Sequence, residues 1–290
     1  MLLLLPLVSL ISRLSDLGIT LSSGGGFDIT VDGVAFAEDA NIKVVLAGVT
    51  YTNKDGTLKQ ASTTNATGAD PLGSYAEHRI AWIAGTTAFE TAVRVYTGSD
   101  TVVFEQHWPH GATGTAAVPP TAKDSSGIVA GYPALALLDP AGRGYLAFGG
   151  RQLETCFSGS LADAGFNTGD GGGGPLSIFD RKGRTLTVTV ASEFMSTSWG
   201  KVVPPQPSAP VVLASGTVAS MTTLPAGFKV LTMVVSGTGP TASVVDAGTK
   251  LLTLYGKNAT ASRAADLTLS TLGVSTDNGA YYYGHTEAGG

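Results

Sequence analysis

The chain has 290 residues, enough for one large domain or two ordinary ones, and 43% of them are hydrophobic, so a sizeable core can be buried. Its 17 basic and 22 acidic residues give a net charge of −5 with no basic stripe, which argues against nucleic acids and anionic membranes as partners. Only 13% of the residues are charged, whereas 39 are glycine and 14 are proline, a composition that favours β-structure with many turns.

The chain begins with an apolar run, Met1 to Ile11, which is too short to span a bilayer because a membrane helix takes about 20 residues. This run is typical of a secretory signal peptide, and Ser22-Ser23-Gly24 offers small residues for cleavage, although no Lys or Arg precedes it. We therefore predict a signal peptide over residues 1–23 and a secreted or endomembrane-lumenal protein. A misassigned start or a buried segment is the alternative. Sequons at Asn65 and Asn258 agree with secretion but also arise by chance.

Strand patterns dominate from about residue 27 to residue 235. Phe89, Val93 and Val95 are separated by even intervals, so they share one face of a strand. Glu90 and Arg94 take the opposite face. This period of two predicts a half-buried strand.

Residues 185–190 repeat the pattern with threonine as the polar residue. Leu186, Val188 and Val190 are predicted to face the core, and the three threonines that alternate with them, Thr185, Thr187 and Thr189, to face outward. Further predicted strands are Phe27–Val31, Ile42–Ala47, His78–Ile83, Thr101–Glu105, Tyr145–Phe148, Leu176–Phe179, Val211–Ala214 and Phe228–Val235. Turn residues separate them at Asp32-Gly33, Asp55-Gly56, Lys182-Gly183 and Ala141–Gly144. So many strands with few helical intervals predict two large antiparallel sheets packed face to face.

Two stretches are predicted to be irregular, residues 119–127 and residues 167–174. The second is rich in glycine, so its backbone is free and costly to order. A phosphate cradle is the alternative, but the Lys-Ser/Thr pair and the helix that should follow are missing. Pro175 and a predicted strand follow instead.

Few side chains outside the strands suggest chemistry. The single cysteine, Cys156, excludes an intrachain disulfide and lacks a neighbouring His and Asn, which argues against a nucleophilic thiol; a buried thiol is one interpretation. His107 and His110 lie three residues apart, but a zinc site needs more ligands and a rigid frame. We expect the end of a strand with a solvent-facing loop there, and no metal.

The pattern changes after residue 245. Residues 249–256 predict a short helix that Thr249 caps and Gly256 ends. Residues 266–272 predict another helical turn, and a strand ending in the three tyrosines Tyr281, Tyr282 and Tyr283 follows. A helix followed by a strand after a long β-region predicts the start of a second domain.

Four segments carry a family resemblance: Gly174–Asp180, Ser192–Met195, Leu224–Phe228 and, above all, Leu272–Tyr283. Together they are similar to the N-terminal portion of a group related to α-galactosidase- and raffinose-synthase-type glycoside hydrolases. The resemblance covers about residue 30 to the end. It implies a mainly β fold, with a large antiparallel β-supersandwich and a short α/β C-terminal segment that starts a truncated (β/α)8 barrel.

The resemblance also implies a domain organisation. After residues 1–23, it implies a β-supersandwich over residues 24–245. Residues 246–290 would hold a linker helix and the first barrel strand, with the remaining C-terminal barrel of the same chain missing. Trp108 could then reach over the mouth of that barrel.

The resemblance implies a sugar contact on the last predicted strand. Active sites of such barrels lie at the C-terminal ends of the strands, where Asp277 would accept hydrogen bonds from sugar hydroxyls beside Asn278. The rings of Tyr281, Tyr282 and Tyr283 would pack against the pyranose. An ordinary Asp-Asn-Gly turn followed by a half-buried strand is the alternative.

The predicted function is therefore that of a fragment of a carbohydrate-active enzyme, a glycoside hydrolase or transglycosylase, with a carbohydrate as its partner. Glycosidic hydrolysis usually needs two carboxyl groups. The resemblance places both on later barrel strands, so we assign no catalytic residue here and expect no cofactor. The alternative is a secreted, non-catalytic carbohydrate-binding β-sandwich with an aromatic platform on one sheet.

Overall fold

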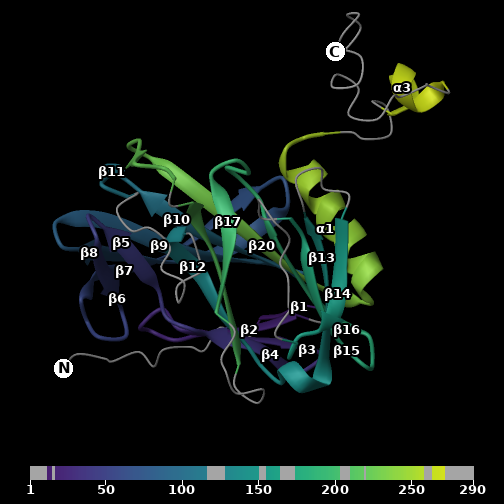
Figure 1. The fold of residues 1–290 in the computed structure, drawn as a ribbon, viewed down its shortest axis with the longest axis horizontal. Helices are drawn as coiled ribbons and strands as arrows, with labels where there is room; N and C mark the ends of the chain where they lie inside the picture. The colour runs from purple at the N-terminus through teal and green to yellow at the C-terminus, as the bar shows by residue number, and fades with distance from the viewer. Residues whose placement is uncertain are drawn as a thin grey trace, which may run out of the picture.

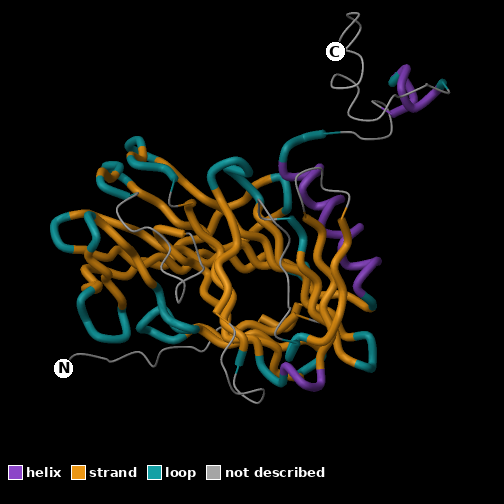
Figure 2. Tube along the Cα trace, in the orientation of Figure 1, coloured by secondary structure: helices purple, strands orange, loops and turns teal. Residues whose placement is uncertain are grey.

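The computed structural model describes residues 12–14, 17–115, 128–149, 155–163, 174–202, 210–218, 220–257 and 263–271. Two nine-stranded antiparallel sheets make up most of this part of the chain, with one longer helix on the outside (Figures 1 and 2). The predicted mainly β sandwich is confirmed.

The first sheet has the strand order β1-β2-β3-β4-β12-β18-β17, and a hairpin of β5 and β6 joins it through β12. Its strands are β1 (Ser12–Leu14), β2 (Leu17–Leu21), β3 (Phe27–Val31), β4 (Val34–Asp39), β5 (Lys43–Leu46), β6 (Val49–Thr52), β12 (Ile128–Leu137), β17 (Thr197–Val202) and β18 (Val211–Val218).

The second sheet has the order β14-β13-β15-β16-β20-β10-β9-β8-β7. Its strands are β7 (Leu58–Asp70), β8 (Gly73–Ala84), β9 (Thr87–Tyr96), β10 (Thr101–Trp108), β13 (Arg143–Gly149), β14 (Thr155–Ser160), β15 (Leu176–Asp180), β16 (Arg184–Val190) and β20 (Phe228–Thr238). A short ribbon pairs β11 (Ala112–Thr113) with β19 (Thr223–Leu224).

The main core lies between the sheets, because strands of both present alternate apolar side chains inward. Phe89, Val93 and Val95 of β9 are buried there as predicted. Phe27 from the first sheet meets Phe104 from the second with ring centroids 4.9 Å apart. The two sheets are therefore in direct contact. Every strand predicted between residues 27 and 235 overlaps an observed one, whereas the strand predicted to end in Tyr281–Tyr283 lies outside the described residues.

The predicted turn at Asp32-Gly33 is confirmed as the link between β3 and β4. Both residues have positive φ, 49° and 74°. Two such residues in a row match the right-handed twist of the flanking strands, so they form a tight hairpin.

The helix α1 (Pro240–Leu254) corrects the prediction for residues 185–190. Leu186, Val188 and Val190 face the core as predicted. The threonines between them are also buried, because α1 packs on their side of the sheet. The hydroxyl of Thr187, for example, lies 2.7 Å from that of Ser243 on α1. The outer face of the second sheet is thus partly covered, with a second apolar cluster around Tyr96, Val103, Met233, Val235 and Ala247.

The bounds of α1 correct a second prediction. The helix begins at Pro240, with Gly239 as its N-cap, so Thr249 lies inside it and does not cap it. Gly256 does end it: its φ is 60°, and it and Lys257 donate backbone hydrogen bonds to the last turn. α1 packs on the sheet on both sides of residue 245, since Ser243 and Ala247 are both buried.

The predicted helical turn over residues 266–272 is present as α3 (Leu267–Ser270). No helix in the described ranges is both long and apolar enough to cross a membrane.

The segment predicted to be a signal peptide contains the strand β2. Leu17 and Ile19 of β2 are buried, and β2 pairs with β3 from Leu17↔Val31 to Leu21↔Phe27. Cleavage at Ser22-Ser23-Gly24 would remove this strand from the first sheet.

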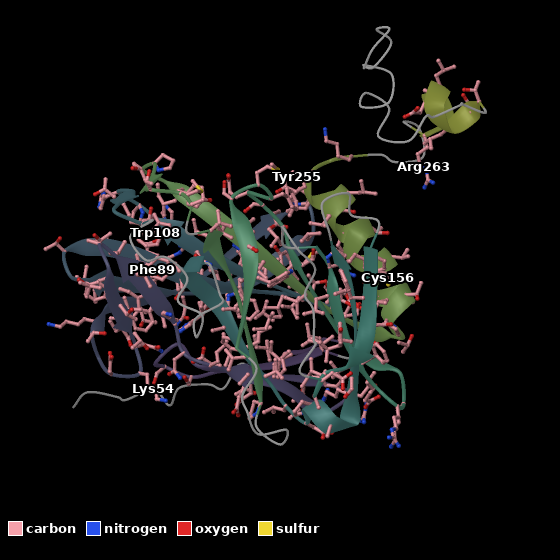
Figure 3. The ribbon with its side chains drawn as sticks, in the orientation of Figure 1. Lys54, Phe89, Trp108, Cys156, Tyr255 and Arg263 are labelled. Carbon is pink, nitrogen blue, oxygen red and sulfur yellow. The ribbon has the colours of Figure 1, made fainter. Side chains whose placement is uncertain are left out.

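Cys156 corrects a smaller prediction. Its thiol is exposed, not buried, because it lies on β14, the edge strand beside β13 (Figure 3).

Asp39, at the end of β4, is a carboxyl group in an unfavourable environment. Burial raises its pKa to about 6, and the charges of Asp28 and Glu38 add to the effect, while a backbone hydrogen bond at Asn41 opposes it. Its Oδ1 atom has no hydrogen-bond partner among the described residues. The folded state therefore holds a proton on Asp39 more tightly than the unfolded state does.

We expect Asp39→Asn to stabilise the protein above about pH 6, by about 1–2 kcal/mol after solvent screening. The native pKa lies above the unfolded value of 3.8, so the stability that the protonated group provides is complete below about pH 4 and is lost as the pH rises through about 6. Urea unfolding at about pH 4 and about pH 8 checks this, because the two proteins should differ only at the higher pH. Equal stability at both values would show that the Asp39 carboxylate is not penalised.

Candidate functional surface

The structure does not place the predicted sugar contacts. Asp277, Asn278, Tyr281, Tyr282 and Tyr283 lie outside the described residues, as does most of the predicted glycine-rich loop. The candidate surface is therefore built from the described part of the sandwich.

A cluster of charged side chains lies on the outer face of the second sheet, next to the part that α1 covers. Val103 and Glu105 are two residues apart on β10, so their side chains lie on the same face of the sheet. The apolar cluster under α1 and the charged side chains therefore share that face. We call this group the charged cluster; it consists of Glu77 and Arg79 on β8, Glu90 and Arg94 on β9, Glu105 and His107 on β10, and Lys229 on β20.

Glu105 is the centre of the charged cluster. Its side chain is only 1% exposed, and its two oxygens accept hydrogen bonds from the guanidinium groups of Arg79, at 2.9 Å, and Arg94. The ammonium group of Lys229 lies 3.5 Å from Oε1 of Glu105. A buried carboxylate on β10 is therefore held by cations from three other strands of the same sheet, β8, β9 and β20.

Two further carboxylates complete the network. Glu77 bridges both arginines, with Oε1 3.0 Å from Nε of Arg79 and Oε2 2.9 Å from Nε of Arg94. Glu90 accepts from Nη1 of Arg79 at 3.0 Å and lies 2.8 Å from Nδ1 of His107. Each arginine thus bonds at least two carboxylates, which fixes its planar group.

The electrostatics of the cluster favour ionised carboxylates. Burial opposes the charge on Glu77, but hydrogen bonds from Arg94 and Arg79 outweigh it and hold its pKa below the usual value. Burial is likewise outweighed at Glu90 by His107 and Arg79, so the pKa of Glu90 is lowered too. Neither group suits a general acid, which must hold a proton near neutral pH. The charged cluster therefore has a structural role, because its ion pairs link β8, β9, β10 and β20.

The region around His107 confirms one prediction and corrects another. His107 ends β10 as predicted, and its side chain is 17% exposed. Trp108 is fully buried and packs on Phe89, with ring centroids 4.8 Å apart (Figure 3). It cannot reach over a barrel mouth. Among the described residues, no group of three or more His, Cys, Asp or Glu side chains could hold a metal ion.

A second feature lies at the end of α1. Phe194 and Tyr255 contact each other with ring centroids 6.4 Å apart, and they are 52% and 47% exposed. Met195 beside them is 95% exposed. The Tyr255 hydroxyl donates to the carbonyl of Ala191, which ties α1 to the end of β16. We call Phe194, Met195 and Tyr255 the terminal apolar patch; neither aromatic residue lies on a sheet face.

Sequence reasoning missed both features. Glu90 and Arg94 were predicted to share an outward face, which is confirmed, but their partners depend on strand neighbours that no local pattern reveals. The segment Ser192–Met195, quoted for the family resemblance, does supply part of the terminal apolar patch.

Comparison with known proteins gives matches in structure alone. No protein-family model matches the chain, and no curated protein matches its sequence. The α-N-acetylgalactosaminidase NagBb from Bifidobacterium bifidum matches with a TM-score of 0.56 and 11% identity, over 84% of this chain and 38% of that one. A glycoside hydrolase family 97 enzyme from Pseudoalteromonas sp. strain K8 matches with a TM-score of 0.50 and 11% identity, over 79% and 35%. The GH36 α-galactosidase AgaA from Geobacillus stearothermophilus matches with a TM-score of 0.45 and 8% identity, over 81% of this chain and 34% of that one.

These matches show the fold. The chain resembles the N-terminal β-sandwich domains of glycoside hydrolases, and it spans little more than a third of the length of the enzymes it matches. The resemblance inferred from the sequence is thereby confirmed in part, at the level of the fold.

Proposed function

We propose that this chain is the β-sandwich part of a carbohydrate-active enzyme that hydrolyses or transfers glycosyl groups, and that it is inactive without a catalytic barrel. The observation that carries the proposal is the match of 84% of the chain to a region covering 38% of an α-N-acetylgalactosaminidase. Fold alone does not establish activity, so the reaction rests on this likeness and on the segment Leu272–Tyr283.

The chemistry of the described residues agrees with a supporting role. Glycosidases usually work with one carboxyl group that holds a proton and one that is free to act as a nucleophile or base. The carboxylates of Glu77, Glu90 and Glu105 are instead engaged by arginines. The catalytic pair would come from outside this chain, and Asp277, Asn278 and the tyrosines Tyr281–Tyr283 would contact the sugar.

The terminal apolar patch supports a further domain beside α1. Apolar side chains as exposed as Met195, at 95%, mark contact surfaces when they gather. The patch lies at the C-terminal end of α1, because Tyr255 directly follows the last residue of the helix, and Leu272–Tyr283 comes later in the sequence. A domain that follows α1 would cover Phe194, Met195 and Tyr255. Secretion would place such an enzyme where extracellular glycans are available.

Sugar binding by the isolated chain tests this function. We expect no hydrolysis of aryl α-galactosides, and we expect any sugar affinity seen by calorimetry to fall at least about tenfold in Asp277→Ala and Tyr282→Ala, since each removes a direct contact. Affinity that survives both changes would assign the sugar site to the sandwich and favour the binding-module alternative. Hydrolysis by the chain itself would refute the claim that it is inactive.

A further inference from the structure

The free edge of the second sheet has the properties of a strand that pairs with another strand. β7 ends the sheet order, and among the described residues it pairs only with β8. Every side chain from Lys59 to Thr67 is exposed. Figure 1 shows β7 and β8 at the opposite end of the molecule from α1, so pairing there would leave the terminal apolar patch free.

β7 lacks most of the features that keep natural edge strands apart. Such edges are usually short or carry charges or prolines. β7 has 13 residues, and no residue from Gln60 to Ala69 is charged or is proline. Gln60 and Ser62 pair with adjacent residues of β8, so Ala61 is a bulge, but it interrupts only the first part of the strand. A long stretch of backbone remains available to a partner strand.

Two charged residues of opposite sign, Lys59 and Asp70, flank this uncharged stretch and favour a second copy of β7 as the partner strand. Lys59 pairs with Ile83 and Asp70 with Gly73, so the two charges are ten positions apart along β8 and lie on the same face. Asn65 pairs with His78, midway between these positions. A second β7 related by a two-fold axis at Asn65 would therefore place each Lys59 opposite an Asp70. The Asp70 carboxylate already accepts hydrogen bonds from the Tyr96 hydroxyl, at 2.6 Å, and the Leu72 backbone N–H, at 2.8 Å, so Lys59 would be an additional partner. Opposite charges directly across a strand pair stabilise it.

The side chain at the centre suits a symmetric contact. Oδ1 of Asn65 lies 2.7 Å from Nδ1 of His78, and a carbonyl oxygen has a second lone pair. That lone pair and the two amide N–H donors would face the Asn65 of the other copy, where the two amide groups can bond each other. The neighbouring threonines Thr63 and Thr64 are well suited to a strand surface.

We propose that two copies of this chain pair antiparallel through β7, with the two-fold axis at Asn65, to form one continuous sheet. The pairing is independent of the proposed glycosyl chemistry, but it requires that Asn65 carries no glycan. Because a strand-edge contact is small, the dimer is weak, with a dissociation constant in the micromolar range.

Disulfide trapping tests this register. In a Cys156→Ser background made in bacteria, so that Asn65 carries no glycan, Asn65→Cys places two thiols directly opposite, within the roughly 4–7 Å between Cα atoms that a disulfide needs. The matched control is Ser62→Cys, whose two copies would be about 20 Å apart at about 3.3 Å per residue. We expect mild oxidation to cross-link Asn65→Cys at least about tenfold faster than Ser62→Cys. Equal rates, or faster cross-linking of Ser62→Cys, would overturn the proposal.

A charge at the centre gives a second readout without new thiols. Asn65→Lys sets two ammonium groups opposite each other, which should weaken the dimer at least about tenfold in sedimentation analysis. Thr253→Lys, on the exposed side of α1, should leave it unchanged. A protein that stays monomeric at about 100 µM, or a dimer that Asn65→Lys does not weaken, would contradict pairing through β7.

Discussion

Replacing Glu105 with alanine is expected to lower the free energy of unfolding by about 3–5 kcal/mol. The change removes the buried carboxylate between the guanidinium groups of Arg79 and Arg94 and leaves Glu77, among the described residues, as the carboxylate that still bridges them. Glu105 is almost fully buried, with its side chain only 1% exposed, so water cannot replace the lost partner cheaply. Urea unfolding near neutral pH measures the loss.

A matched variant isolates the role of burial. Lys229 contacts the same carboxylate at 3.5 Å, but its side chain is 47% exposed, so Lys229→Ala should cost less than about 1 kcal/mol. If the two substitutions cost the same, the charged cluster would be an ordinary set of surface ion pairs and not a buried tie.

Replacing Trp108 with alanine is expected to cost about 3–5 kcal/mol, the second large effect. The side chain is fully buried and packs on Phe89, so its removal leaves a cavity that the surrounding sheets cannot fill. Trp108→Phe should cost much less, because it keeps a ring and removes the indole N–H, which has no hydrogen-bond partner among the described residues. The urea midpoints of the three proteins check the order.

The same measurement distinguishes the buried position of Trp108 in the structure from the position over a barrel mouth that the sequence suggested. A tryptophan that reached out over a neighbouring domain would be replaceable at little cost to the isolated chain. An unfolding midpoint for Trp108→Ala equal to that of the wild type would therefore indicate that the Trp108 side chain lies at the surface.

Strands that are polar on one side and apolar on the other could be predicted from the sequence. β9 and β16 are clear examples, because Phe89, Val93 and Leu186 follow the period of two that burial on one side requires. The fold class followed from the number of such strands and from turns such as Asp32-Gly33.

Strands without that alternation were missed. β7 is exposed along most of its length, so burial imposes no pattern on residues such as Thr63 and Thr64. β12 is buried on both sides as far as it is described and contains Gly131 and Pro133, which normally indicate a turn. Sequence patterns within one strand fail in both cases, because the burial of each strand face depends on the elements that pack on the sheet.

The outward face of β16 shows the same limit. Thr185, Thr187 and Thr189 have the polarity of a surface, yet α1 packs on that side of the sheet. Their hydroxyls are satisfied locally, as in the bond from Thr187 to Ser243. The threonine pattern could not predict this burial, because the helix that covers these residues lies more than fifty residues further along the chain.

The candidate surface was least accessible to sequence reasoning. Glu77 and Glu105 are in different strands, and both meet Arg94 only because β8, β9 and β10 are neighbours in the sheet. By contrast, Asp277 and Tyr282 were predicted from a motif alone and remain a prediction, because they lie outside the described residues.

Our proposal that this chain is the supporting domain of a glycoside hydrolase rests on the sandwich fold and on the exposure of the terminal apolar patch. The most direct test is the coding sequence that follows the codon for Gly290 in the native transcript. Our account predicts an open reading frame of alternating strand and helix patterns with further aspartates, as a (β/α)8 barrel requires. A stop codon directly after Gly290 would contradict it.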